Sequence, residues 1–314
     1  LNVSHTGSGA RSSSSAFPTA ELGIFVSPVA GSGALHVDEV VAGGPFDNSR
    51  TKLQKGSLIT AIDGEKLEAG KDYFPLLNDK VGKRLLVSFR TASGEQVDEV
   101  IRPISSSALN DLLYKRWVKQ RAEEVERVSK GTLGYVHIPS MGDPSFRTVY
   151  SDVMGKYYQK KGIVIDIRYN GGGRLHEDIE AFFTGKHYAD QVVRDRQYSE
   201  MSSRRWNRPS VLVTCEADYS NAHGTPWVYQ HLKVGKVVGM PVAGTMTSVN
   251  WVTLLDPSVY FGIPAVGFRL FDGRYLENTQ MEPDVVVPLD PTKVLQGIDT
   301  QIEKAVEVLR AETK

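Results

Sequence analysis

The sequence predicts a multi-domain α/β protein, in which a smaller β-rich domain precedes a larger domain of alternating strands and helices. Residues 21–104 contain short strand patterns separated by Gly, Pro and Asp-Gly turns. From about residue 105 to 314, apolar strand patterns alternate with amphipathic helical patterns, which is typical of an α/β domain. A chain of 314 residues is long enough for two domains or more.

Charge and composition exclude several classes of function. Lys plus Arg and Asp plus Glu both total 37, and this balance gives no support for a nucleic-acid partner. No apolar run reaches membrane length, and the 40% hydrophobic content is typical of a globular protein. No metal-ligand spacing of His, Asp or Glu stands out, so no cofactor is expected. The single cysteine, Cys215, cannot form an internal disulfide and is expected to be buried in an apolar strand.

Residues 1–20 are interpreted as the tail of a preceding domain followed by a linker. Residues 7–15 are rich in Gly and Ser and are predicted to be flexible. His5, beside that linker, would ordinarily be a solvated surface residue. The chain begins at Leu1 without a signal-like segment, which we interpret as a fragment or a processed product.

Residues 21–104 form the smaller domain. Strands are expected near residues 23–26, 35–37, 55–64 and 84–90, with a short helix near 73–77. This order, with the loop Leu22-Gly23-Ile24-Phe25 and the segment KGSLITAIDG, resembles a PDZ domain, a small β-barrel or sandwich. The resemblance implies that loop N–H groups hold a peptide C-terminus beside an edge strand. A PDZ-shaped spacer with a closed groove is the alternative.

The larger domain, residues 105–314, follows an alternating order. Helices are expected over residues 106–130, 148–159 and 299–310, and strands over 133–139, 210–214, 234–240, 251–255, 259–261 and 264–271. The segment GIVIDIRYNGGG, residues 162–173, predicts a strand buried on both faces that ends in three glycines. The glycines could serve only as a strand exit, or their N–H groups could meet an anion. They are not a phosphate loop, because the required lysine and hydroxyl residue are absent.

Ser220 is the candidate nucleophile. It lies in a turn between the strand 211–213 and a helical segment, 225–232. A short side chain there lies beside outward-pointing N–H groups that could hold an oxyanion. Serine is also a common helix N-cap, so capping remains the alternative. A catalytic serine needs a base, which the rest of the chain must supply.

Six segments in order resemble the C-terminal part of the tricorn protease family, serine peptidases related to the carboxyl-terminal processing peptidases. They are SHTGSG, GYVHIPSMGD, GIVIDIRYNGGG, DYSNAH, VGKVVGMPVAGT and LENTQMEPDVVV, and with the PDZ-like unit they cover essentially the whole chain. The resemblance implies an α/β serine peptidase domain that hydrolyses peptides through an acyl-enzyme. It also implies a closed homo-oligomer, a hexamer in the full-length protein, and a cytoplasmic location, with the periplasm as the alternative.

Roles carry over from the resemblance position by position. Ser220 matches the nucleophile and His5 the general base, while Ser4 and Glu277 match the groups that orient the histidine. The oxyanion-hole donors match Gly173 and Asn221. Asn221 stands where the type member of the family has aspartate, but its backbone N–H donor is unchanged. Residues 194–208 align poorly, and Asp190 is the nearest candidate for an acidic substrate-binding residue.

Other mechanisms and functions remain open. In a Ser-Lys processing peptidase the lysine follows the serine by about two dozen residues, but residues 242–247 contain none, and Lys233 and Lys236 fall too early. His223 is the best alternative base, because it is near Ser220 in the sequence. His176 and His187 are expected to be structural or exposed. A PDZ scaffold with an inert hydrolase domain is the alternative outside the enzymes.

Overall fold

The computed structural model describes residues 3–10 and 18–313. The chain divides into two compact units, one formed by Leu1–Arg11 together with Val118–Lys314, the other by Ser12–Trp117. Helix α1, Ser106–Ser129, contains the division point. The predicted domain limits at residues 20 and 104 stay predictions. No helix within the described residues is both long and apolar enough to cross a membrane.

A five-stranded parallel sheet forms the centre of the larger unit. Its strand order is β16-β13-β12-β9-β8, with the bounds β8 Leu133–His137, β9 Gly162–Asp166, β12 Ser210–Thr214, β13 Lys236–Gly239 and β16 Val285–Val286. Every residue of β9 and β12 is buried, because helices cover both faces. The predicted α/β class is thereby confirmed.

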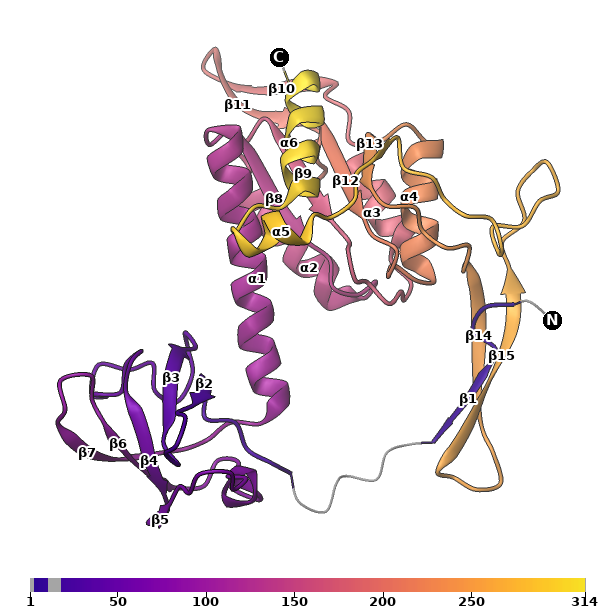
Figure 1. The fold of residues 1–314 in the computed structure, drawn as a ribbon. Coiled ribbons are helices and arrows are strands. Elements are labelled where there is room, and N and C mark those ends of the chain that lie inside the picture. The colour runs from indigo at the N-terminus through magenta and orange to yellow at the C-terminus, as the bar shows by residue number, and fades with distance from the viewer. Residues whose placement is uncertain (1–2, 11–17, 314) are drawn as a thin grey trace. The chain divides into compact units, whose positions relative to one another are not determined.

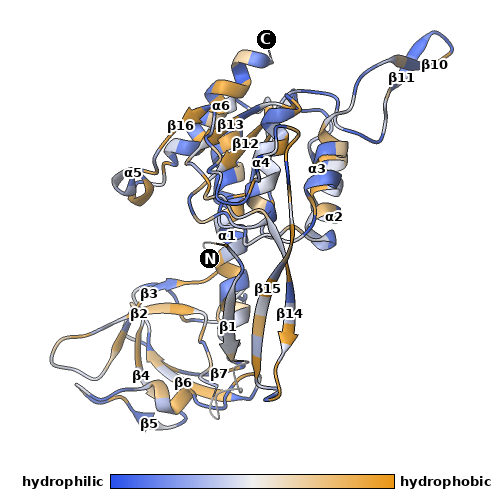
Figure 2. Ribbon diagram, turned by 90° about the vertical axis from the view of Figure 1, so that its right-hand side faces the viewer, coloured by the Kyte–Doolittle hydropathy of each residue, from blue (hydrophilic) through white to orange (hydrophobic). Residues whose placement is uncertain are grey.

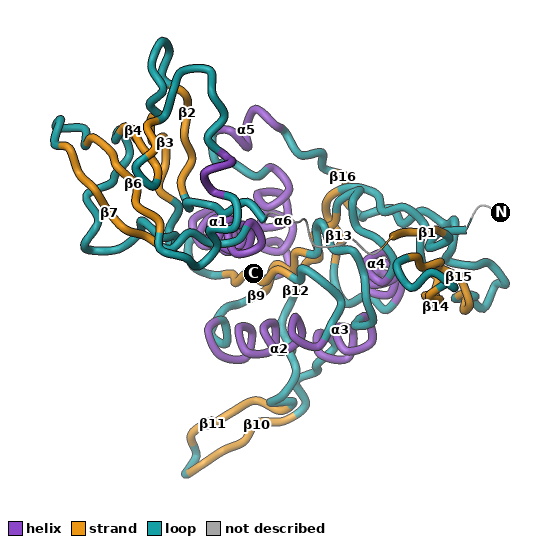
Figure 3. The backbone as a smooth tube through the Cα atoms, turned by 90° about the horizontal axis from the view of Figure 1, so that it is seen from below, coloured by secondary structure: helices purple, strands orange, loops and turns teal. Residues whose placement is uncertain are grey.

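The helices on the two faces of the parallel sheet pack into two separate hydrophobic cores. Figure 3 shows α2 and α3 on one side of the sheet and α6 on the other. Side chains of α2, α3 and α4 pack in one cluster, which includes Val149, Phe182 and Tyr229, and those of α1 and α6 in another, which includes Val125 and Val306. Figure 2 shows the hydrophobic strands β12 and β13 within this layered arrangement. The bounds are α2 Asp143–Ser151, α3 His176–Phe183, α4 Asn221–His231, α5 Pro291–Leu295 and α6 Thr300–Glu312.

The predicted helix over residues 148–159 was misplaced. Helix α2 begins at Asp143, with a proline in its first turn, and passes into the one-turn π-helix η2, Asp152–Lys156. Proline at this position is favourable because the N–H that it lacks would have no partner within the helix. The sequence pattern indicated the apolar face of this helix but not its first residue.

A second, antiparallel sheet contains the N-terminal segment. Strand β1, Gly7–Ala10, pairs with β15, Val259–Gly267, which pairs with β14, Thr247–Thr253 (Figure 1). The prediction of a flexible linker over residues 7–15 is therefore wrong for residues 7–10, and residues 11–15 lie outside the described part. A Gly/Ser-rich segment has no apolar period, so its strand state depends on the backbone hydrogen bonds that β15 offers. The predicted strand over 264–271 ends early, at Gly267.

An exposed hairpin was not predicted. Strands β10, Ala189–Val193, and β11, Arg196–Met201, pair antiparallel, and all residues of β10 are exposed. All of β11 falls in the stretch, residues 194–208, that aligned poorly.

The smaller unit contains a six-stranded antiparallel sheet of the order β2-β3-β4-β6-β7, with β5 paired to β4. The bounds are β2 Ile24–Pro28, β3 Leu35–Val40, β4 Leu58–Ile62, β5 Glu65–Lys66, the 3-10 helix η1 Phe74–Leu77, β6 Leu85–Arg90 and β7 Gln96–Ile101. Its core includes Val37, Ile59, Val87 and Phe89. Strands are present at all four predicted places, whereas β7 was not predicted.

Candidate active site

The glycine run after β9 packs against the turn that contains Ser220. A Cβ atom on Gly172 would lie 2.5 Å from Cβ of Ser220, and one on Gly173 would lie 2.1 Å from the Met141 carbonyl oxygen. Gly173 also has a φ of +140°, which side chains disfavour. Asn170 holds the loop from within, because its side chain donates to the Ile138 carbonyl (2.8 Å) and accepts from the Gly172 N–H (2.8 Å). The glycines therefore allow two backbone segments to approach closely.

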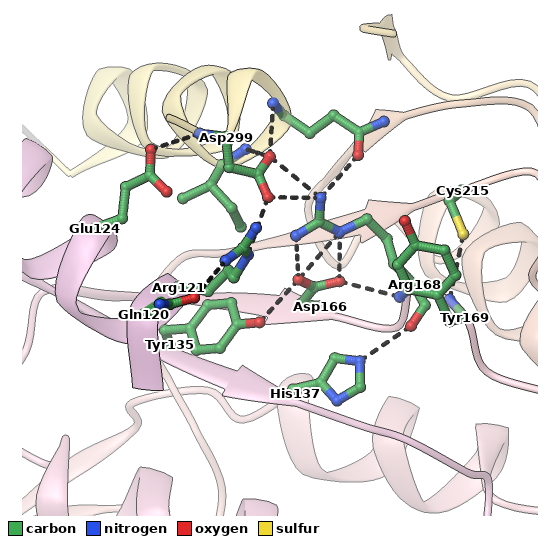
Figure 4. A network of polar contacts seen from close by, with 12 residues as sticks. Gln120, Arg121, Glu124, Tyr135, His137, Asp166, Arg168, Tyr169, Cys215 and Asp299 are labelled. Carbon is green, nitrogen blue, oxygen red and sulfur yellow. Dashed lines mark hydrogen bonds and ion pairs between the residues drawn. The ribbon is translucent and has the colours of Figure 1, made fainter. Parts of the chain in front are cut away.

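A buried charge network fixes the start of this loop (Figure 4). The Arg168 guanidinium lies 2.6 Å from Asp166 and 2.9 Å from Asp299, and all three side chains are buried. Burial raises the pKa of Asp166, but the Arg168 charge outweighs that effect, so this pKa is lowered. Arg168 thus connects the end of β9 to the residue that caps α6, since the Asp299 side chain accepts the N–H groups of Gln301 and Ile302.

Ser220 occupies a strained turn between β12 and α4. Its φ is 58° and its ψ is −121°, a conformation that is rare for a residue with a side chain. The Tyr219 N–H donates to the Asn170 carbonyl (2.9 Å), and the Ser220 N–H donates to Oγ1 of Thr245 (2.8 Å). The Ser220 hydroxyl makes no cap hydrogen bond to α4, although it stands at the N-cap position. The capping interpretation therefore does not describe this side chain.

Two backbone donors lie beside Ser220. In the described part of the chain, the N–H groups of Gly173 and Asn221 have no hydrogen-bond acceptor. Both residues line the cavity that Ser220 lines. Free N–H groups in this position can bind a negatively charged oxygen.

The N-terminal segment brings a histidine to the same place. The Ser4 hydroxyl lies 2.7 Å from Nδ1 of His5 and 3.0 Å from Oε2 of Glu277. Glu277 also accepts the Ser4 N–H and, at 2.7 Å, the Thr247 hydroxyl. The His5 N–H donates to the Tyr219 hydroxyl (2.9 Å), and the centroids of the His5 and Tyr219 rings are 4.7 Å apart. Tyr219 thus joins the histidine segment to the serine turn.

The hydrogen bonds of Ser4 determine the tautomer of His5. An ionised Glu277 can only accept, so the Ser4 hydroxyl donates to it and must accept from His5 Nδ1–H. The proton of the neutral imidazole is then on Nδ1, and Nε2 is free to take a proton. Burial lowers the pKa of His5, and the Glu277 charge partly opposes this. No hydrogen bond joins His5 to Ser220 among the described residues, as is common in sites without substrate.

A cavity of about 690 Å³ contains these groups. Its polar part includes His5, Ser220, residues of the glycine loop and the first two residues of α3. Its apolar part comes mainly from β14, β15 and their flanks, namely Met246, Val249, Trp251, Val266 and Phe268. Two of these apolar side chains are largely exposed, Trp251 at 56% and Val266 at 55%. The cavity is therefore large enough for a peptide segment and has one apolar wall.

Other sequence candidates lie elsewhere. Asp190 is on the exposed strand β10, where it bonds His187 (2.7 Å) and Gln197 (2.8 Å), and it does not line this cavity. His223 is fully buried, and its Nδ1 accepts the Thr245 N–H (3.3 Å). No lysine is among the described residues that line the cavity.

Four residues at the candidate site were not predicted from the sequence. The Tyr219 hydroxyl accepts the His5 N–H, and the Thr247 hydroxyl donates to Glu277. The Thr245 hydroxyl accepts the Ser220 N–H, and His176 lines the cavity. Only His176 carried a usable signal, because it is three residues beyond the last glycine of the run and begins a helix. The other three are ordinary loop or strand residues until the fold brings them together.

Comparison with known proteins identifies related peptidases. Residues 132–287 match the model of Peptidase family S41, so the chain contains a domain of that family of peptidases. It is a relative of the tricorn proteases, as the sequence resemblance predicted. It is 27% identical over 261 residues to the tricorn protease of Thermoplasma acidophilum, across 82% of this chain and 24% of that protein. The tricorn protease homolog of Saccharolobus solfataricus is 26% identical over 269 residues, across 84% and 24%.

The fold comparison covers both units. A crystal structure of the tricorn protease superposes with a TM-score of 0.82 over 99% of this chain and 31% of that chain, at 24% identity. This chain spans about a quarter of the length of the curated relatives named above.

Proposed function

We propose that this protein is a serine endopeptidase that hydrolyses peptides through an acyl-enzyme at Ser220. His5 is the general base, Ser4 and Glu277 orient it, and the N–H groups of Gly173 and Asn221 form the oxyanion hole. The observation that carries the proposal is the convergence of a polarised histidine, a strained serine and two free N–H groups on one cavity. These parts come from four separate stretches of the chain.

The geometry supports a definite sequence of proton transfers. Nε2 of His5 removes the Ser220 proton as Oγ attacks the scissile carbonyl, and the resulting imidazolium is stabilised through Ser4 by the Glu277 charge. The same Nε2 then gives the proton to the leaving amine. Water repeats the cycle on the ester, with His5 again as the base. Each oxyanion donor contributes about 3 kcal/mol to transition-state stabilisation in other hydrolases.

A second proposal concerns the smaller unit. We propose a PDZ-like domain that binds peptide C-termini. Strand β2 is at the end of its sheet, so one edge is available for addition of a peptide strand. The resemblance to the tricorn family further suggests a homo-oligomer, a hexamer in the full-length protein, and a cytoplasmic location.

One experiment tests the nucleophile directly. The protein is treated with an active-site organophosphonate, and the labelled peptide is identified by mass spectrometry. We expect the label on Ser220 and none in the Ser220→Ala variant. Label on another residue would contradict the assignment.

A second experiment tests the base. Cleavage of fluorogenic peptides is measured for His5→Ala and for His223→Ala separately. Loss with His5→Ala alone supports the proposal, and loss with His223→Ala alone contradicts it. Peptide binding by the full-length protein without any cleavage would instead favour the scaffold function. Labelling that depends on a lysine and not on His5 would favour the Ser-Lys mechanism.

A further inference from the structure

The amide of Asn221 has only one orientation that satisfies its neighbours. One end of this amide receives the backbone N–H groups of Leu175 (2.9 Å) and His176 (3.1 Å). A backbone N–H can only donate, so the atom facing both of them is the oxygen Oδ1. The amide nitrogen Nδ2 therefore faces Nδ1 of His176, at 2.8 Å, and donates to it.

This orientation determines the tautomer of His176. Because Nδ1 accepts a hydrogen bond, it carries no proton, and the neutral ring has its proton on Nε2. A protonated ring would place an N–H against the N–H of Asn221. Burial lowers the pKa of His176, and the charges nearby are those of Glu177 and Asp178, which raise it, and of Arg174, which lowers it. His176 is thus a neutral hydrogen-bond donor at neutral pH.

The donor is available to a ligand. His176 is half-buried and lines the cavity with Ser220, and its ring is nearly perpendicular to the ring of Phe268, with 6.3 Å between the two ring centroids. In the described part of the chain, Nε2 has no protein partner. Val266 and Trp251 lie on the same cavity wall. A bound peptide would exclude water from this wall, and a donor there needs an acceptor from the ligand.

We propose that His176 is a substrate-binding residue, which donates Nε2–H to a carbonyl oxygen of the peptide chain bound beside Ser220. Asn221 is the positioning residue, because its side chain sets the tautomer while its backbone N–H belongs to the oxyanion hole. The inference rests on the proposed peptidase function. It adds a contact on the substrate, opposite in chemical role to His5, whose Nε2 accepts a proton.

Two substitutions separate the role of Nε2 from that of Nδ1. The glutamine side chain places its amide nitrogen near the position of Nε2, whereas asparagine places its amide near Nδ1. His176→Gln therefore keeps the donor toward the substrate and loses the bond to Asn221. His176→Asn keeps a partner for Asn221 and loses the donor.

The measurement is kcat/KM at pH 8 for the best-cleaved member of a panel of internally quenched peptides. We expect about a tenfold loss for His176→Asn and a loss below about threefold for His176→Gln, as the removal of one hydrogen bond to substrate predicts. His231→Gln, an exposed histidine at the end of α4, is the matched control. Equal losses, or a larger loss for His176→Gln, would overturn the inference.

Two further readouts separate this inference from the proposed function. The rate at which a small organophosphonate labels Ser220 should be the same in His176→Asn and wild type, since that reagent has no peptide chain. No labelling of wild type would contradict the peptidase proposal itself. In a Ser220→Ala background, His176→Asn should weaken binding of the same peptide about tenfold, measured by fluorescence anisotropy. Unchanged binding would overturn the role of His176 alone.

Discussion

Ser4 decides which nitrogen of His5 carries the proton, because its hydroxyl donates to Glu277 and accepts from Nδ1. A serine between carboxylate and histidine transmits the negative charge less directly than a carboxylate in contact with the ring. Thr247 adds a second donor to the same carboxylate oxygen, and thereby fixes its direction. We propose a catalytic role for these groups, and this role leads to two predictions about single residues.

Replacement of Glu277 by glutamine should lower kcat about 100-fold with little change in KM. A neutral amide no longer requires Ser4 to donate toward it, so the hydroxyl can turn to Nδ1 and leave the imidazole in the wrong tautomer. Steady-state kinetics with a fluorogenic peptide would measure this loss. Glu282→Gln, the same change at an exposed position nearby, should leave kcat unchanged. Equal kinetics of the two variants would argue against the orienting role.

The acid limb of the pH profile should lie below the ordinary histidine range. His5 acts as a base only when neutral, and burial lowers its pKa from 6.5. The value of kcat/KM should therefore fall as the pH decreases through a midpoint below 6.5. The Glu277 charge raises this pKa, so Glu277→Gln should move the midpoint further toward acid. A midpoint that does not respond to Glu277→Gln would contradict the assignment of this limb to His5.

At the scale of elements, the loop that follows β9 requires glycine at particular positions. Gly173→Ala would put a methyl group 2.1 Å from the Met141 carbonyl oxygen, at a φ of +140°. We expect about 2 kcal/mol or more of lost stability and severe loss of activity, because the loop must move away from the serine turn. Gly171→Ala is the matched control, since nothing lies within 4 Å of its added Cβ. Its free energy of unfolding should change by about 0.5 kcal/mol at most, measured by chemical denaturation.

At the scale of the whole larger unit, the proposed site depends on residues 1–10, which are distant in sequence from the other residues of the site. Strand β1 attaches the segment of Ser4 and His5 to β15 through a short antiparallel ladder. Removal of residues 1–10 should abolish peptide hydrolysis and leave the parallel sheet folded, because none of its five strands pairs with β1. Circular dichroism and a thermal melt would report the fold, and fluorogenic peptides the activity. Removal of residues 1–2 alone should preserve activity.

Much of the architecture follows from local patterns. The continuous apolar residues of β9 and β12 predict buried parallel strands, since water-exposed faces would interrupt such runs with polar residues. The position of Ser220 between a strand and a helix follows from the same periodicity. The hairpin of β10 and β11 was not predicted, because β10 is exposed along its whole length and β11 is exposed over its first half, so neither strand has an apolar alternation to detect.

The sequence by itself determined the α/β class, the buried central strands and the turn that holds Ser220, because each depends on neighbouring residues and on the period of apolar side chains. It marked His5 only through a family resemblance, since a histidine beside a Gly/Ser-rich segment has no local signal of a function. Tertiary structure alone decided that residues 7–10 form a strand, that Ser4 and Glu277 share hydrogen bonds, and that His176 faces the cavity of Ser220. These contacts join residues up to 273 positions apart, and only the folded chain brings such residues within hydrogen-bond distance.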